Sequence, residues 1–293
     1  MTAPTPLSLC PGFLALPGFA DPAPLLAAGR ARLAAVTAAD AATSLFSTRD
    51  QGKVSPSYFL ASATTAAPFF EDAAVDLATG ALTTPTPGAG VNKIGHALHE
   101  VDDAFRAFCR SPRLASIFRS LAYARPAPIQ SMYIVKGAGV GGEVVPHQDS
   151  AFLWTDPTPS VVGCWLALQD AGEANGCLWA VPGSHAGAVV DRFVRTEGEE
   201  GVTLGFARGT RPDLPSAGAI PLPATAGTLI LLHGSLVHFS APNTGAASRH
   251  AFTVHVVETG KGSRWCERNW LQRPPDMPLT PLYEEGGDEA GGE

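Results

Sequence analysis

Short apolar runs separated by glycine, proline and asparagine dominate the second half of the chain. The clearest are residues 130–136, 163–169, 176–181, 228–232 and 249–257. Such runs, bounded by turn-forming residues, are typical of β-strands. A regular series of short strands favours a double-sheet jelly roll. The pattern therefore predicts a mainly β protein whose core lies in this half of the chain.

The first half of the chain predicts a short strand and then a helix. Residues 12–19 are apolar and closed by proline and glycine, which indicates a strand. Asp21 is placed to cap a helix that continues to about Thr37. The alanine-rich residues 38–42 also favour helix.

Two further segments complete the expected secondary structure. Residues 50–67 predict a loop with a strand at residues 58–60. Residues 101–124 carry apolar side chains at roughly helical spacing, which predicts a second helix packed on the outside of a sheet. The expected fold is a β core with flanking helices.

We expect one domain over residues 1–281. Residues 282–293 are rich in glutamate and glycine and predict a disordered acidic tail.

A polar triplet, His147-Gln148-Asp149, follows a short apolar pair and carries the first candidate chemistry. Alternate residues of a strand share one face, so a strand here would bring His147 and Asp149 together. An imidazole and a carboxylate on one face are two of the three ligands that hold non-haem Fe(II). Such triplets also recur by chance in surface turns, so the prediction depends on a third ligand.

His238 is the favoured third ligand, and His233, at the end of an apolar run, is the alternative. Arg249 follows His238 at the start of the next predicted strand. We expect these two segments to be neighbouring strands, with His238 and Arg249 side by side. The planar guanidinium could then bind a carboxylate whose other end chelates the metal.

Six segments of the chain occur in the order found in a known enzyme family. They are residues 92–99, 130–134, 141–149, 175–179, 182–185 and 238–249. Through them the chain resembles the phytanoyl-CoA dioxygenase family of Fe(II)- and 2-oxoglutarate-dependent oxygenases, over roughly residues 90–275. The resemblance implies the double-stranded β-helix form of the jelly roll. It also implies hydroxylation of a small metabolite or acyl substrate with release of succinate and CO2.

The same resemblance implies the site. Fe(II) would be bound by His147, Asp149 and His238, with 2-oxoglutarate and O2 as co-substrates. The far carboxylate of 2-oxoglutarate would lie on Arg249. Four further residues match positions that line the 2-oxoglutarate pocket in the family; they are Lys93, Met132, Trp165 and Ser240.

Some of these residues also have ordinary structural interpretations. Met132 and Trp165 would be core residues on sequence grounds alone, and Ser240 could be a solvated serine. His185 lies in a predicted turn and is expected to be structural. His255 is at even spacing from Arg249, so it could face the same interior, either beside the metal ligands or as a core histidine.

The segment Asp191–Gly218 carries four arginines between the two metal motifs: Arg192, Arg195, Arg208 and Arg211. It predicts a solvated surface loop, or else one that contacts an anionic substrate.

Asp149 argues against the related halogenases, because they carry glycine or alanine at this position so that halide can bind iron. Two other classes stay open. One is a jelly-roll protein that binds or senses 2-oxoglutarate without catalysis. The other is a zinc or nickel cupin enzyme, which would not require a carboxylate clamp at Arg249.

Composition narrows the expected partners and location. The net charge of -7 and pI near 5.6 argue against nonspecific nucleic-acid binding. The five cysteines are an odd number without a CxxC pair, which favours reduced thiols in a cytoplasmic protein over zinc-finger or disulfide frameworks. The N-terminus lacks a basic signal-peptide region, and no apolar run is long enough to span a membrane. We expect a cytoplasmic monomer that binds a small molecule and neither nucleic acid nor membrane.

Overall fold

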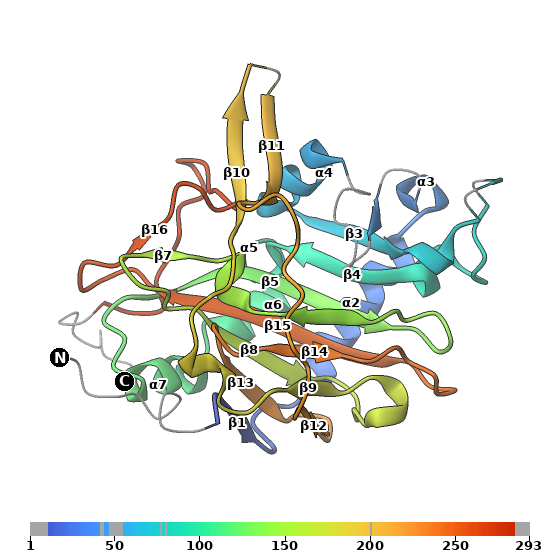
Figure 1. The fold of residues 1–293 in the computed structure, drawn as a ribbon. Helices are drawn as coiled ribbons and strands as arrows, with labels where there is room; N and C mark the ends of the chain where they lie inside the picture. The colour runs from blue at the N-terminus through green and yellow to red at the C-terminus, as the bar shows by residue number, and fades with distance from the viewer. Residues whose placement is uncertain are drawn as a thin grey trace.

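Two β-sheets face one another in the computed structural model, which describes residues 11–41, 44–46, 55–76, 78–79, 81–199 and 201–284 (Figure 1). In spatial order, the eight-stranded sheet contains β1 (Phe13–Leu16), β13 (Leu229–His233), β8 (Val162–Ala167), β15 (Arg249–Glu258), β5 (Pro126–Lys136), β4 (Val91–His96), β3 (Ala66–Glu71) and β2 (Leu45–Phe46). The four-stranded sheet contains β12 (Ile220–Leu222), β9 (Leu178–Ala180), β14 (His238–Ser240) and β6 (Val144–His147). This architecture confirms the expected jelly roll.

Two short ribbons extend from this sandwich. One pairs β10 (Phe193–Gly198) with β11 (Gly201–Phe206), and it projects beyond the sheets in Figure 1. The other pairs β16 (Arg264–Trp265) with β7 (Thr155–Asp156). The segment expected to be a loop between the metal motifs therefore contains a hairpin.

The alternation of side chains along β15 separates two apolar layers. Phe252 and Val254 point outward and pack in a cluster with residues of the flanking helices. Ala251 points inward and packs with residues from the four-stranded sheet, while Thr253 and His255 line an internal cavity. The period of two expected of a strand thus assigns one face to the helices and the other to the site.

The longer helices of the outer layer are α2 (Ala23–Ala35), α6 (Asp103–Cys109) and α7 (Pro112–Ser120). Helix α2 packs so closely on the sheet that a Cβ at Gly29 would lie 1.9 Å from the ring of Tyr133. The Asp21 carboxylate accepts a hydrogen bond from the Ala23 amide at 3.0 Å, but the residue at the capping position is Pro22, one residue later than predicted. The shorter α3 spans Ala38–Ala41.

Two secondary-structure predictions were wrong. The strand expected at residues 58–60 is part of α4 (Pro56–Ala61), because Ser55 caps a helix that begins with proline. The single helix expected over residues 101–124 is divided into α5 (Leu98–Val101), α6 and α7. The Asp102 and Ser111 side chains accept hydrogen bonds from the first amides of α6 and α7, so each begins a new helix.

The end of the chain is described as far as Glu284. Leu282 donates its amide to the Pro126 carbonyl at 2.7 Å, and the Tyr283 hydroxyl donates to the Tyr123 carbonyl at 3.0 Å. Residues 285–293, most of the expected tail, lie outside the described residues. The division into one domain and a tail stays a prediction. Within the described ranges, no helix is both long and apolar enough to cross a membrane.

Candidate active site

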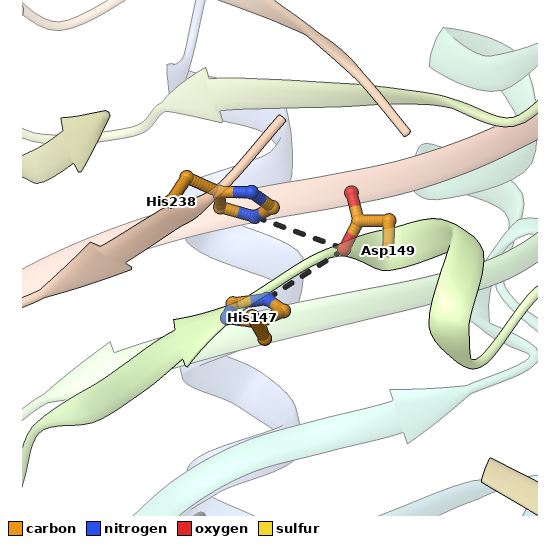
Figure 2. A group of neighbouring side chains, drawn as sticks. All are labelled: His147, Asp149 and His238. Carbon is orange, nitrogen blue, oxygen red and sulfur yellow. Dashed lines mark ion pairs between the residues drawn. The ribbon is translucent and has the colours of Figure 1, made fainter. Parts of the chain in front are cut away.

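His147, Asp149 and His238 converge at one point between the sheets (Figure 2). His147 ends β6, His238 begins β14, and these two residues are direct partners in the antiparallel pairing of the strands. The distance from Asp149 Oδ1 to Nε2 is 3.6 Å for His147 and 3.7 Å for His238. The pairing of β6 with β14 therefore brings the distant histidine to the His-x-Asp motif.

Asp149 reaches this point by a different backbone path from the one expected. Strand β6 ends at His147, and Asp149 begins a 3-10 helix, η5 (Asp149–Ala151). Gln148 between them remains extended, with φ -120° and ψ 126°, which keeps His147 and Asp149 on the same side. The Gln148 side chain donates to the Ser235 carbonyl at 2.8 Å, which anchors the turn.

The hydrogen bonds of the two histidines leave the Nε2 lone pairs free to bind a metal. Nδ1 of His147 lies 2.9 Å from the Val145 carbonyl, and Nδ1 of His238 lies 3.0 Å from the Leu236 carbonyl. A carbonyl can only accept, so each Nδ1 carries a proton, and in the neutral ring Nε2 is the nitrogen with a free lone pair. Burial, and then the neighbouring His238, lowers the pKa of His147 to about 3, so this imidazole is neutral.

Asp149 supplies the negative charge. Burial alone would raise its pKa, but His255, His238 and His147 together lower the pKa below its ordinary value. The Nε2–Oδ1 separations are too long for hydrogen bonds. Two imidazole nitrogens and one carboxylate oxygen thus face the same point, a donor set that fits Fe(II).

Two residues of the opposite sheet lie close to the Asp149 carboxylate. His255 on β15 is buried, and its Nε2 lies 3.2 Å from Asp149 Oδ2, leaving Oδ1 toward the other histidines. Gly163 on β8 lies so close that a Cβ there would be 2.8 Å from Oδ2. His255 is therefore a neighbour of the carboxylate in the candidate metal site rather than an ordinary core histidine.

His233, the alternative third ligand, lies elsewhere. Its Nδ1 accepts a hydrogen bond from the Ser235 amide at 3.1 Å, and its ring packs on His185 at 5.2 Å between centroids. The geometry therefore favours His238.

A cavity of about 170 Å³ adjoins the three convergent side chains. Met132, Thr253 and Trp165 are cross-strand partners on the inner face of the eight-stranded sheet, and all three line it. All eight residues expected at the site from the sequence line this cavity; they are Lys93, Met132, His147, Asp149, Trp165, His238, Ser240 and Arg249.

Arg249 is a buried cation with unused hydrogen-bond donors. Its Nη2 donates to the Gly176 carbonyl at 2.5 Å, but Nε and Nη1 have no acceptor within the part of the chain that the structure describes. Burial lowers the pKa of Arg249 to about 10, so it is charged at neutral pH. A buried charge is costly without a partner, so this side chain fits an anionic ligand such as a carboxylate.

Arg249 and His238 are not on paired strands, which corrects the sequence prediction. His238 is on β14 of the four-stranded sheet, and Arg249 is on β15 of the eight-stranded sheet. The turn between them crosses from one sheet to the other. The two side chains consequently line one cavity from its two walls, an arrangement suited to a ligand that spans the space between the sheets.

Lys93 is a second buried cation in the cavity. Its Nζ lies 3.7 Å from the ring centroid of Phe46 and 5.0 Å from that of Phe69. Burial lowers the pKa of Lys93 to about 7, although Glu71 opposes that shift. The lysine can therefore change charge near neutral pH.

Only one of the four arginines in the segment Asp191–Gly218 lines the cavity, and it is Arg211. The guanidinium of Arg192 lies 4.7 Å from the Trp154 ring, and Arg195 pairs with Glu197 at 3.2 Å. Most of this charge therefore lies away from the site.

His96 is a cavity residue to which sequence analysis assigned no role. It is fully buried, and its Nε2 has no hydrogen-bond partner among the described residues. The only sequence signal was its position near Lys93, within one of the segments that resemble the family.

Comparisons with known proteins show the family to which the chain is similar. The sequence model of "Phytanoyl-CoA dioxygenase (PhyH)" matches residues 9–251. The chain is 43% identical to phytanoyl-CoA dioxygenase 1 of Oryza sativa subsp. japonica, covering 93% of each chain. It is 44% identical to phytanoyl-CoA dioxygenase domain-containing protein 1 of Mus musculus, covering 80% of this chain and 78% of the mouse protein.

Solved structures share the fold at low sequence identity. One is the epimerase SnoN in complex with Fe3+, alpha-ketoglutarate and nogalamycin RO, with a TM-score of 0.57, 19% identity, and coverage of 94% of this chain and 90% of that chain. Another is EctD from S. alaskensis with 2-oxoglutarate and 5-hydroxyectoine, with a TM-score of 0.52, 17% identity, and coverage of 84% and 72%. The family match confirms the resemblance read from the sequence. The chain therefore belongs to the phytanoyl-CoA dioxygenase family, a family of non-haem iron and 2-oxoglutarate-dependent enzymes.

Proposed function

We propose that this protein is an Fe(II)- and 2-oxoglutarate-dependent dioxygenase that hydroxylates a small metabolite or an acyl substrate. The single observation that carries the proposal is the combination found in one cavity. Three convergent metal-ligating side chains line it, and so does a buried arginine with unused donors.

The protein's own residues would each have a distinct part in this reaction. His147, Asp149 and His238 would hold Fe(II) through Nε2, Oδ1 and Nε2. Arg249 would bind the far carboxylate of 2-oxoglutarate, and Ser240 is close enough in the cavity to contribute a hydroxyl.

The bound iron, with 2-oxoglutarate and O2, would supply the oxidation. Substrate, 2-oxoglutarate and O2 would give hydroxylated substrate, succinate and CO2. Lys93, Met132 and Trp165 would complete the 2-oxoglutarate pocket.

The apolar lining of the cavity is the second contribution of the protein. Leu153, Phe152 and Trp165 give the cavity apolar walls, and Asp149 and Arg249 are both buried. Exclusion of water strengthens charge interactions and protects reactive species from side reactions. These features favour catalysis over binding or sensing of 2-oxoglutarate without catalysis.

Turnover of 2-oxoglutarate tests the proposal. Purified protein is incubated with Fe(II), 2-oxoglutarate and O2, and succinate is measured, first without substrate and then with a metabolite panel. We expect succinate only when Fe(II) is present, and none from His147→Ala. Metal-dependent binding of 2-oxoglutarate with no succinate under any condition would instead support the alternative, a catalytically silent 2-oxoglutarate-binding protein. Equal turnover with zinc or nickel in place of iron would contradict the proposal.

A further inference from the structure

His96 lines the cavity, and one nitrogen of its ring is buried without a hydrogen-bond partner among the described residues. The imidazole is fully buried beside the rings of Phe59 and Trp270, at centroid distances of 5.4 and 5.0 Å. All three of these side chains line the cavity. His96 Nε2 has no hydrogen-bond partner within the described part of the chain. Buried polar atoms in native proteins are usually paired, so an unpaired one in a cavity points to a ligand.

The hydrogen bonds of Ser62 determine which nitrogen of His96 carries the proton. Ser62 Oγ lies 2.5 Å from the Phe59 carbonyl oxygen and 2.8 Å from His96 Nδ1. A hydroxyl has one proton, and two oxygens this close require it between them. Ser62 therefore donates to Phe59 and accepts from His96 Nδ1–H. Nε2 of the neutral ring is left as an acceptor.

The charge state agrees with this assignment. Burial lowers the pKa of His96 well below its ordinary value, and the nearby Lys93, His255 and Arg273 lower it further. The imidazole is neutral at physiological pH and offers the cavity one lone pair and no proton.

2-Oxoglutarate does not complement this atom. At neutral pH its two carboxylates and its keto group are all hydrogen-bond acceptors, so it has no proton to offer His96 Nε2. His96, Phe59 and Trp270 are also outside the set expected to bind 2-oxoglutarate. The nitrogen therefore serves a different molecule in the same cavity.

We propose that His96 Nε2 accepts a hydrogen bond from a hydroxyl or N–H group of the substrate, whose adjoining carbon skeleton lies against Phe59 and Trp270. This inference rests on the proposed oxygenase function and names the substrate class. The substrate is uncharged at this end, carries a hydrogen-bond donor, and has a planar or alicyclic group beside it. An acyl thioester has only acceptors near its carbonyl, so it leaves His96 unsatisfied at that end.

Matched probes test this subsite without turnover. Benzyl alcohol and benzyl methyl ether share a ring, but only the alcohol has a donor. Their dissociation constants are measured by ligand-observed NMR with protein loaded with Zn(II) and 2-oxoglutarate. We expect the alcohol to bind about tenfold more tightly, the effect of one hydrogen bond. In His96→Phe this preference disappears, whereas His185→Phe, which alters a histidine outside the cavity, retains it.

Ser62→Ala provides a sharper test, because Ser62 does not line the cavity. Without its acceptor, Nδ1–H loses the bond that fixes the tautomer, and the Nε2–H form becomes accessible. We expect the preference for the alcohol to fall below about threefold, since an Nε2–H group can donate to the ether. Ring 15N shifts, with His96 assigned by its loss in His96→Phe, should report Nε2 as unprotonated in the wild type.

The outcomes separate the two proposals. Protonated Nε2, equal binding of the two probes, no binding of either, or an alcohol preference that survives in His96→Phe would each overturn the subsite. Fe(II)-dependent succinate formation, measured on the same protein variants loaded with Fe(II) in place of Zn(II), tests the oxygenase function separately. If succinate forms but the probes are not distinguished, only the subsite is wrong. If only water occupies the subsite, benzyl alcohol will not shift the His96 15N resonances.

Discussion

Replacement of Arg249 tests separately how its charge and its planar geometry contribute to the proposed binding of the far carboxylate of 2-oxoglutarate. The guanidinium is almost completely buried, and one of its nitrogens is bound to the Gly176 carbonyl. The remaining donors would bind the far carboxylate of 2-oxoglutarate. Arg249→Lys keeps a charge but loses the planar group, while Arg249→Met removes the charge and keeps most of the volume.

The burial of Arg249 sets the expected magnitude. Removing one partner of a buried ion pair costs about 3–5 kcal/mol, because the other charge is left uncompensated. At about 1.4 kcal/mol per decade, Arg249→Met should weaken 2-oxoglutarate binding by roughly two to four decades. Lysine restores the charge without the paired donors, so Arg249→Lys should weaken it by about tenfold. Metal affinity should change little, because Arg249 is not a metal ligand.

Calorimetric titration checks both quantities. Mn(II) replaces Fe(II) to prevent turnover, and 2-oxoglutarate is titrated into the metal-loaded protein after a separate Mn(II) titration. Arg192→Met is the matched control, because that arginine stacks on Trp154 outside the cavity. Unchanged 2-oxoglutarate affinity in Arg249→Met would refute the proposal that Arg249 binds the far carboxylate. Lys93, the other buried cation of the cavity, would then be the residue to replace.

Three further predictions concern the candidate metal ligands and the buried lysine. His238→Ala should abolish stoichiometric Fe(II) binding and His233→Ala should not; the reverse result in a metal titration would reassign the third ligand. Gly163→Ala should weaken Fe(II) binding while circular dichroism stays native, because its Cβ would lie 2.8 Å from Asp149 Oδ2; native metal affinity would contradict this. Burial lowers the pKa of Lys93 to about 7 in the folded protein, against 10.5 in the unfolded chain. Between these two pH values the unfolded chain binds more protons than the folded protein. The free energy of unfolding of the wild type therefore rises with pH through this window. Urea unfolding should therefore show Lys93→Met to be more stable than the wild type at pH 7, and the difference in free energy of unfolding should narrow toward pH 10. A difference that stays constant with pH would exclude the lowered pKa of Lys93.

The sequence by itself determined the local parts of this protein. The short strands followed from apolar runs closed by turn residues, because strand formation depends on neighbours in the chain. The proximity of His147 and Asp149 followed from their spacing, since one extended residue between them keeps both side chains on one side. The inward face of β15, with Arg249, Thr253 and His255, followed from the same alternation.

Helix boundaries were harder to predict from the sequence. The apolar spacing in residues 101–124 is helical, but Asp102 and Ser111 cap new helices within it. A cap forms only when the residue before the helix takes an extended backbone, and packing against the sheet selects that conformation. Periodicity alone therefore could not show where one helix ends and the next begins.

Only the tertiary structure decided how the site is assembled. The pairing of β6 with β14 brings His238, and not His233, beside His147, and the turn after β14 carries Arg249 to the opposite sheet. Neither fact is local, because cross-strand register and sheet packing depend on the whole fold.

The unsatisfied Nε2 of His96 is likewise a property of the folded protein. A histidine in a sequence has no defined partner or burial. The ring proton of His96 is fixed on Nδ1 only when the folded chain places Ser62 and the aromatic rings around the imidazole. The sequence thus specified which groups could do chemistry, and the fold decided which of their atoms remain free to do it.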